Sequence, residues 1–222
     1  AAAIKAYATS SDATATINQA TISYTAPAPG VASFSSRGPL LAGSGDLLKP
    51  DLIAPGQDIL AAVSPDTAHG MDFNLLSGTS MSSPHVAGLA ALLRAMHPTW
   101  TPMAIKSALM TTGKDVIEAG TLKRNQRTSD PEVVFAQGAG HVQPNLAANP
   151  GLVYDSGWAD WLAFLCGTTD AVGPNTCATL KAAGYSTDPS DLNTPSIAIG
   201  DLAGKQTVTR RVTNVSDRPV HY

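Results

Sequence analysis

Residues 77 to 93, SGTSMSSPHVAGLAALL, constrain the fold of this chain more than any other stretch. Apolar residues recur in it at three- and four-residue spacing, which predicts a helix: Val86, Leu89, Ala90 and Leu93. Pro84 is tolerated only in the first helical turn, where its missing N–H has no partner to lose. The helix is therefore expected to begin near Thr79 or Ser80. Its other faces carry small residues, so we expect it to be buried on all sides.

The composition of the chain limits the classes of protein to which it can belong. Its 222 residues are 43% hydrophobic and 14% charged, which is too apolar for a disordered chain and enough for one full core and part of another. The net charge of −3 gives no electrostatic reason to expect nucleic acid or a membrane as a partner. No run approaches 18 apolar residues, and the N-terminal stretch lacks the pattern of a signal peptide.

The rest of the chain reads as short elements separated by turns rich in glycine and proline. The helix at 101–113 has the clearest limits, with Thr101 as cap, Pro102 as first helical residue and Gly113 as stop. The other expected elements, in chain order, are a helix end at 4–9, a strand at 14–26, a short buried strand at 51–54, a strand at 58–65, a surface loop at 66–76, a solvated loop at 114–133, a packed irregular segment at 135–155, a short helix at 160–166 and two strands within 194–222.

The two cysteines, Cys166 and Cys177, lie close together in CGTTDAVGPNTC. A disulfide closing this short loop is plausible in an oxidising compartment. The alternative is a pair of free cysteines acting as small apolar residues. Two cysteines at this spacing do not predict a metal site, because a structural metal site normally has four ligands.

Ser80 is either a nucleophile or a helix cap. A hydroxyl at a helix N-terminus usually caps it by accepting a hydrogen bond from an N–H two or three residues on. Gly78 removes a side chain where another group must approach closely. Neighbouring hydroxyls offer alternative caps and leave Ser80 free: Thr79, Ser82 and Ser83. If the helix is buried, its unpaired N–H groups face the floor of a cleft, where they can hold a developing oxyanion.

The stretch SGTSMSSPHVAGLAALL is very similar to the nucleophile signature of the subtilisin-like serine proteases (subtilases), and Ser80 takes the place of the nucleophile. The segments FSSRGP and KPDLIAPG agree with the same family. Two further segments, HPTWTPMAIKSALMTT and GAGHVQPNLAANPGLVYD, resemble plant-type subtilases in particular.

The resemblance implies an α/β fold, namely the C-terminal half of a subtilisin-like three-layer fold with a mainly parallel sheet, followed by the start of a β-sandwich. It implies four regions: the exit of an inserted protease-associated domain at 1–24, the catalytic half-domain at 25–157, a helical linker containing the cysteines at 158–190, and the beginning of a fibronectin type III-like domain at 191–222.

Subtilases supply their catalytic groups in the order Asp, His, Ser, and the first two motifs are not found before Ser80. His69 is the sole upstream histidine, and its surroundings predict a surface residue. The remaining histidines of the helical and glycine-rich segments fit structural places in the family: His85, His97 and His141. Asp51 in KPDLIAPG corresponds to a scaffold position. We therefore expect the base and the carboxylate to come from the N-terminal part of the same protease, and this chain alone to be inactive.

The resemblance thus implies a secreted serine endopeptidase that attacks polypeptide substrates through Ser80. Ser77, Gly78 and Thr79 are expected along the substrate cleft, and the Ser80 N–H as one oxyanion donor. No cofactor is expected, although calcium is possible in the parent enzyme. The alternative is a non-catalytic interaction module with a protease-like surface. An esterase using His69 as base is disfavoured, because no G-x-S-x-G elbow is present. Asn214 begins the sequon NVS, which permits glycosylation in a eukaryotic source.

Overall fold

The computed structural model describes residues 2–16, 19, 28–66, 69–118, 132–219 and 221. Its α-helices are α1 (Ala2–Tyr7), α2 (Thr79–Met96), α3 (Pro102–Thr111), α4 (Glu132–Gln137), α5 (Pro144–Ala147), α6 (Trp158–Thr168) and α7 (Pro174–Ala182), with short 3₁₀ turns η1 (Ala42–Gly45) and η2 (Pro189–Asp191). Its strands are β1 (Gly30–Val31), β2 (Ile59–Ala62), β3 (Phe73–Leu76), β4 (Ile117–Glu118), β5 (Leu152–Val153) and β6 (Thr213–Asn214).

The strands form three small ladders. β1 and β4 pair in parallel, whereas β2 with β3 and β5 with β6 pair antiparallel. The expected strand at 51–54 is reduced to one parallel bridge between Ile53 and His141. The α/β class is confirmed, but within the described residues the strands do not join into an extended parallel sheet.

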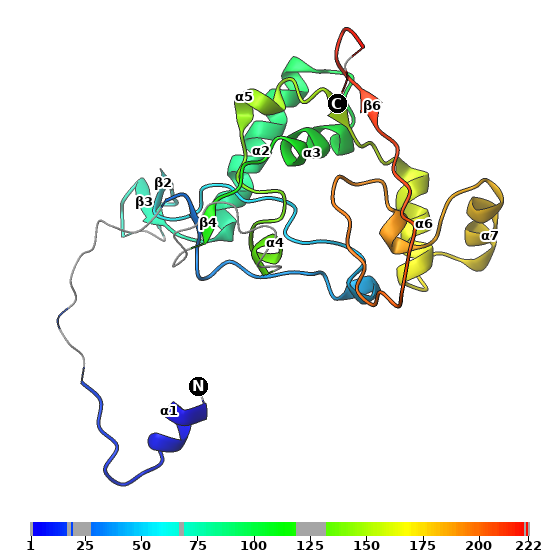
Figure 1. Cartoon of the computed structure of the whole chain (residues 1–222). Coiled ribbons are helices and arrows are strands. Elements are labelled where there is room, and N and C mark those ends of the chain that lie inside the picture. The colour runs from blue at the N-terminus through cyan, green and yellow to red at the C-terminus, as the bar shows by residue number, and fades with distance from the viewer. Residues whose placement is uncertain are drawn as a thin grey trace.

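The helices α2, α3 and α5 surround the main core, in the middle of the molecule in Figure 1. Its buried members are Leu93, Ile105, Leu109 and Ala147, and the predicted stripe of α2 packs against them through Val86, Leu89 and Ala90. A second cluster of Ala104, Ala108 and Val153 lies on the other side of α3 and receives Val215 from beyond β6. α3 therefore packs on two sides and holds the two clusters together.

The N-terminal limit of α3 follows the sequence closely. The Thr101 hydroxyl accepts from the Ala104 N–H at 3.0 Å, and Pro102 is the first helical residue. The same hydroxyl donates to Asp155 Oδ1 at 2.6 Å, which ties this cap to the segment after β5. The helix predicted to begin near Thr79 or Ser80 and the helix predicted at 160–166 are also confirmed, as α2 and α6.

The expectation that α2 is buried on all sides is wrong. Leu93 is the buried residue of this helix, and the face opposite the core is exposed at Ala87, Gly88, Ala91 and Leu92. Burial on all sides needs a layer over each face. Among the described residues, α3, α5 and the segment around Leu52 pack against one face only.

Two other expectations need correction. The segment 66–76 ends in a strand, β3, whose four residues pair with β2 from Phe73–Ala62 to Leu76–Ile59. The expectation of a loop missed it because strand pairing depends on a partner strand. The segment 194–222 contains β6 as its one regular strand in the described part, and the remainder is irregular.

Most of the strand expected at 14–26 lies outside the described residues, as does most of the loop expected at 114–133. The described helices are too short or too polar to cross a membrane.

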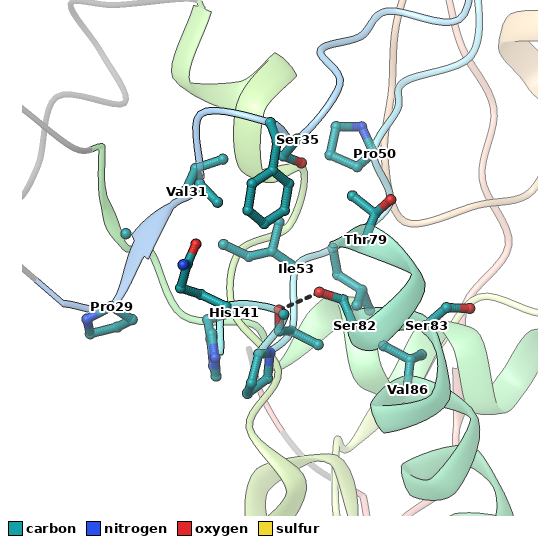
Figure 2. Close-up of a pocket in the computed structure, with 18 of the residues that line it drawn as sticks. Pro29, Val31, Ser35, Pro50, Ile53, Thr79, Ser82, Ser83, Val86 and His141 are labelled. Atoms are coloured by element: carbon teal, nitrogen blue, oxygen red, sulfur yellow. Dashed lines mark hydrogen bonds between the residues drawn. The ribbon is translucent and has the colours of Figure 1, made fainter. Parts of the chain in front are cut away.

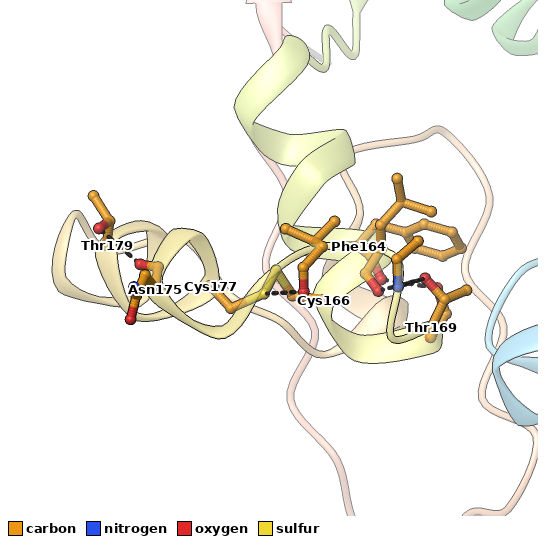
Figure 3. The surroundings of a disulfide bond; sticks show 10 residues. Phe164, Cys166, Thr169, Asn175, Cys177 and Thr179 are labelled. Atoms are coloured by element: carbon orange, nitrogen blue, oxygen red, sulfur yellow. Dashed lines mark hydrogen bonds between the residues drawn. A yellow bond between two sulfur atoms is a disulfide. The ribbon is translucent and has the colours of Figure 1, made fainter.

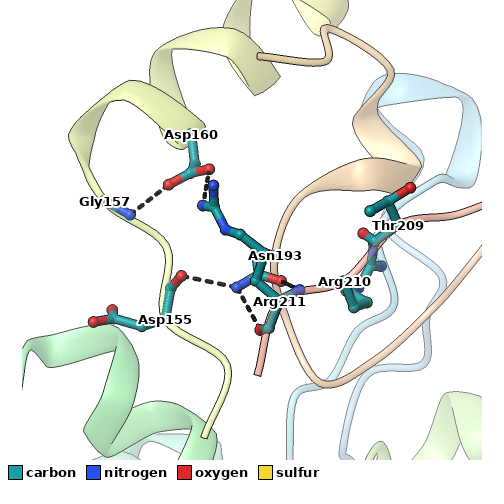
Figure 4. A network of polar contacts seen from close by, with 7 residues as sticks. All are labelled: Asp155, Gly157, Asp160, Asn193, Thr209, Arg210 and Arg211. Atoms are coloured by element: carbon teal, nitrogen blue, oxygen red, sulfur yellow. Dashed lines mark hydrogen bonds and ion pairs between the residues drawn. The ribbon is translucent and has the colours of Figure 1, made fainter. Parts of the chain in front are cut away.

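The C-terminal segment is attached to the body by polar contacts centred on Asn193 (Figure 4). The buried Asn193 side chain donates to the carbonyls of Asp155 and Arg211 at 2.8 and 3.0 Å and accepts from the Arg211 N–H at 2.8 Å. Arg211 also pairs with Asp160, at 2.8 Å, on the first turn of α6. Burial lowers the pKa of the neighbouring Arg210, which donates to the Thr194 carbonyl.

Cys166 and Cys177 form a disulfide that links α6 to α7, with Cα atoms 5.8 Å apart (Figure 3). This settles the two alternatives for the cysteines in favour of the bridge. α7 has no buried residue, and among the described elements it packs mainly against α6. The disulfide therefore replaces the apolar packing that α7 lacks.

A second attachment joins the 49–52 segment to α3. Asp51 accepts from Lys106 at 2.9 Å and from Lys49 at 2.5 Å. Burial lowers the pKa of Lys106, while the Asp51 carboxylate raises it and the Lys49 charge lowers it. This confirms Asp51 as a scaffold residue, since both of its side-chain contacts are structural.

The disulfide makes a measurable contribution to stability. Replacing Cys166 and Cys177 by serine is expected to lower the free energy of unfolding by about 3 kcal/mol, because the bond closes a short loop and restricts the unfolded chain. Urea denaturation measures this loss. A reducing agent should destabilise the native protein equally and leave the double variant unchanged; equal stability of the oxidised protein and the variant would contradict this role.

The Lys106–Asp51 pair gives a pH dependence with a defined sign. Since the folded pKa of Lys106 lies below its unfolded value, the unfolded chain binds more protons between the two values, and stability rises with pH in that window. Asp51→Asn should lower the Lys106 pKa further and cost about 1–3 kcal/mol at neutral pH. Lys49→Met should instead raise the Lys106 pKa, because it removes a neighbouring positive charge. NMR titration of the Lys106 ammonium distinguishes these shifts, and the same direction in both variants would refute the account.

Candidate active site

Ser80 lies in the first turn of α2, directly after the β2–β3 hairpin. The N-cap of this helix is Gly78, and no side chain caps it. Ser80 is exposed, and within the described part of the chain its hydroxyl has no hydrogen-bond partner. The reading of Ser80 as a cap is therefore wrong. The alternative caps are also wrong: Ser82 donates to the Ala54 carbonyl at 2.9 Å, and neither Thr79 nor Ser83 is a cap.

Backbone contacts take the place of a cap. The Gly78 N–H donates to the Gly56 carbonyl at 2.8 Å, and the Met81 N–H donates to the Gly78 carbonyl at 3.0 Å. A Cβ on Gly56 would lie 2.2 Å from Ser82 Oγ and 2.8 Å from the Gly78 carbonyl oxygen. Only glycine permits this close approach, so Gly56 fixes where α2 begins.

A side-chain pair supports the same junction. The Ser77 hydroxyl donates to Asp58 Oδ1 at 3.0 Å and accepts from the Asp58 N–H at 2.8 Å. Asp58 has a φ of 52°, in the left-handed region that aspartate tolerates better than most residues. We call this pair the Asp58–Ser77 clamp. It fixes the residue before the Gly78 cap, and no sequence motif indicated Asp58.

The start of α2 provides a donor beside the hydroxyl. Within the described residues, the Ser80 N–H has no hydrogen-bond acceptor, as expected for one of the first N–H groups of a helix. The positive end of the helix dipole lies at the same place. An exposed hydroxyl next to an unpaired N–H can accept an acyl group and hold the resulting oxyanion.

A cavity of about 500 Å³ lies between the first turns of α2 and β1. In Figure 2, Val31, Ile53 and His141 lie on one side of it and Thr79 and Ser82 on the other. Thr79 lines this cavity, but Ser80 does not. The nucleophile candidate therefore faces solvent next to the cavity rather than within it.

His69 is remote from Ser80. It is exposed in the turn of the β2–β3 hairpin, beyond the Ala62–Phe73 pair, whereas α2 follows the opposite end of β3. The length of β3 separates the two ends by about 10 Å. The prediction of a surface residue is confirmed.

His85, His97 and His141 have structural partners. His85 donates from Nδ1 to the Met81 carbonyl at 2.8 Å. His97 stacks on Trp100 with ring centroids 3.8 Å apart and donates to the Ala148 carbonyl at 2.9 Å. His141 contacts the Val142 carbonyl at 3.0 Å. None of these rings hydrogen-bonds to Ser80, and no cluster in the described part of the chain could hold a metal ion.

Two substitutions that affect the Asp58–Ser77 clamp are expected to differ in their effect on stability. Asp58→Ala should cost about 1–2 kcal/mol, because it removes an acceptor and places alanine at positive φ. Asp58→Asn keeps an Oδ1 acceptor and tolerates this conformation, so it should stay within about 0.5 kcal/mol of the native protein. Urea denaturation measures both, and an equal loss in the two variants would contradict this account of the clamp.

Comparison with known proteins identifies the family of this chain. The profile of the subtilase family matches residues 3–140. The chain is 47% identical over 209 residues to the subtilisin-like protease SBT2.5 of Arabidopsis thaliana, in an alignment that covers 86% of the chain and 26% of that protein. It is 45% identical over 204 residues to SBT1.7 of the same plant, covering 85% of the chain and 27% of that protein.

A soybean relative gives the same result. The chain is 44% identical over 205 residues to the subtilisin-like protease Glyma18g48580 of Glycine max, covering 85% of the chain and 26% of that protein. The chain thus spans about a quarter of the length of these relatives. Because the family profile covers more than half of the chain, this chain belongs to the subtilase family.

Proposed function

We propose that this chain carries the nucleophile of a serine endopeptidase, and that Ser80 forms the acyl-enzyme. The observation that carries the proposal is the exposed Ser80 hydroxyl, unbonded within the described residues, next to its own unpaired N–H. In a capping serine, the side-chain oxygen would accept a hydrogen bond from an N–H of the helix. Membership of the subtilase family supports the same chemistry.

The general base and its carboxylate are proposed to lie in the N-terminal part of the same protease, outside this chain. The placement of four described histidines supports this, since His69 is remote and His85, His97 and His141 bond to backbone carbonyls. A serine hydroxyl without a base is a poor nucleophile at neutral pH, so this chain alone is expected to be inactive.

The reaction then proceeds in two halves. The base takes the proton of Ser80 as Oγ attacks the carbonyl carbon of a peptide bond, and the Ser80 N–H donates to the oxyanion. The amine leaves with the proton, and water releases the acyl group by the reverse sequence. Ser77, Gly78 and Thr79 are proposed to border the substrate; the Ser77 hydroxyl already bonds to Asp58, which leaves its backbone for this role.

The wider organisation is part of the same proposal. The regions are an inserted-domain exit at 1–24, a catalytic half-domain at 25–157 with a three-layer, mainly parallel sheet, a linker at 158–190 and the start of a β-sandwich at 191–222. The Cys166–Cys177 disulfide supports a secreted protein. No cofactor is required by this chemistry, and calcium remains a proposal for the whole protease only. Nucleic acid and membranes are not proposed as partners.

One observation favours the second candidate, a non-catalytic interaction module. One face of the β2–β3 hairpin presents exposed apolar side chains at Leu60, Phe73 and Leu75. Exposed apolar surface of this kind is common at protein–protein contacts. It does not account for the unbonded hydroxyl at the start of α2, so the endopeptidase remains the leading proposal.

A fluorophosphonate probe on the full-length protein separates the two functions. We expect labelling that is lost in Ser80→Ala and retained in Ser83→Ala, which removes a neighbouring exposed hydroxyl. Peptide hydrolysis by Ser80→Ala should fall by about a million-fold in kcat, as it does when subtilisin loses its nucleophile. Absence of labelling in the folded full-length protein would favour the module.

A further inference from the structure

The strand β6 carries a modification motif that the proposed protease chemistry does not use. Asn214 is the one asparagine in the sequence that is followed by a residue other than proline and then by serine or threonine. This is the acceptor pattern for N-linked glycosylation, which requires an accessible asparagine in a protein of the secretory pathway.

The side chain of Asn214 is exposed, and its contacts lie within its own turn. Its Oδ1 accepts from the Ser216 N–H at 2.9 Å and from the Ser216 hydroxyl at 2.6 Å. Its Nδ2 donates to the Arg218 carbonyl at 3.1 Å. One of the two Nδ2 protons is therefore bonded, and the other is available for replacement by a sugar.

The middle residue of the motif fixes the direction of Asn214. Val215 packs against the buried cluster of Ala104, Ala108 and Val153, and its N–H donates to the Gly151 carbonyl at 2.9 Å. Because neighbouring side chains of an extended segment point to opposite sides, Asn214 points away from this cluster. A glycan on Nδ2 would extend into solvent without displacing a core contact.

Two other asparagines lack properties that a glycan acceptor needs. Asn193 is 5% exposed, and its Nδ2 gives both protons to backbone carbonyls of Asp155 and Arg211. Asn175 is followed by Thr176 and Cys177, and the Cys177 sulfur is held in the disulfide. Accessibility, a spare amide proton and the hydroxyl two residues on coincide at Asn214.

We infer that Asn214 is an N-glycosylation site. The co-reactant is an oligosaccharide carried on a polyprenyl diphosphate. The Nδ2–C1 bond forms as the bond between C1 and the diphosphate oxygen breaks, Nδ2 loses one proton, and the polyprenyl diphosphate leaves with the bonding electron pair. No oxidation or reduction takes place.

The test is peptide mapping of the full-length protein made in a eukaryotic host behind an added cleavable signal peptide. This leader sends the protein into the endoplasmic reticulum, so the experiment tests the acceptor separately from the localisation proposed above. Release of the glycan by a peptide N-glycosidase in ¹⁸O-water should convert Asn214 to labelled aspartate. A glycosylated reporter secreted by the same cells shows that the transfer machinery is working.

Four variants define the outcome. The glycan should be lost completely in Asn214→Gln and Ser216→Ala, and retained in Ser216→Thr and Asn175→Gln. Peptide mapping of the glycan does not depend on peptide hydrolysis by the protein. Absence of the glycan would therefore leave the proposed protease function intact. Unmodified Asn214 in native protein that carries the Cys166–Cys177 disulfide would overturn the inference, as would a glycan that survives in Asn214→Gln.

Discussion

The hydrogen bond from the Gly78 N–H to the Gly56 carbonyl determines where α2 begins, and the rest of the site depends on it. Because Gly78 has no side chain and no side chain caps the helix, the cap position is set by this backbone contact. The close approach of Gly56 to Ser82 and the Asp58–Ser77 clamp hold the same junction from the side. Ser80, two residues further on, is thereby left exposed, and its hydroxyl has no hydrogen-bond partner among the described residues.

The packing of α2 on α3 gives this junction a rigid support. Leu93, Ile105, Leu109 and Ala147 form the core against which α2 packs. The core therefore holds the body of the helix, while the contacts of Gly56 and Asp58 hold its first turn. One consequence is that α2 is well fixed although half of it is exposed. In a helix held this way, a reactive group at the N-terminus can stay accessible without loss of stability.

The local patterns predicted much of this architecture. Thr101, Pro102 and Gly113 delimit α3 because capping is decided by residues adjacent in sequence. The stripe from Val86 to Leu93 predicted that α2 is a helix. The hairpin of β2 and β3 was missed, because strand pairing depends on a partner that a loop-like composition does not reveal.

The sequence by itself determined the nucleophile candidate and the family, and through Pro84 it limited the start of the helix to the preceding turn, since these depend on residue types at short spacing. Tertiary structure alone decided that Ser80 is not a cap, that Ser82 bonds to Ala54 and that Asp58 holds Ser77, because each concerns groups far apart in the chain. It also decided which face of α2 is covered. Small side chains on every face permit burial, but only neighbouring elements can supply it.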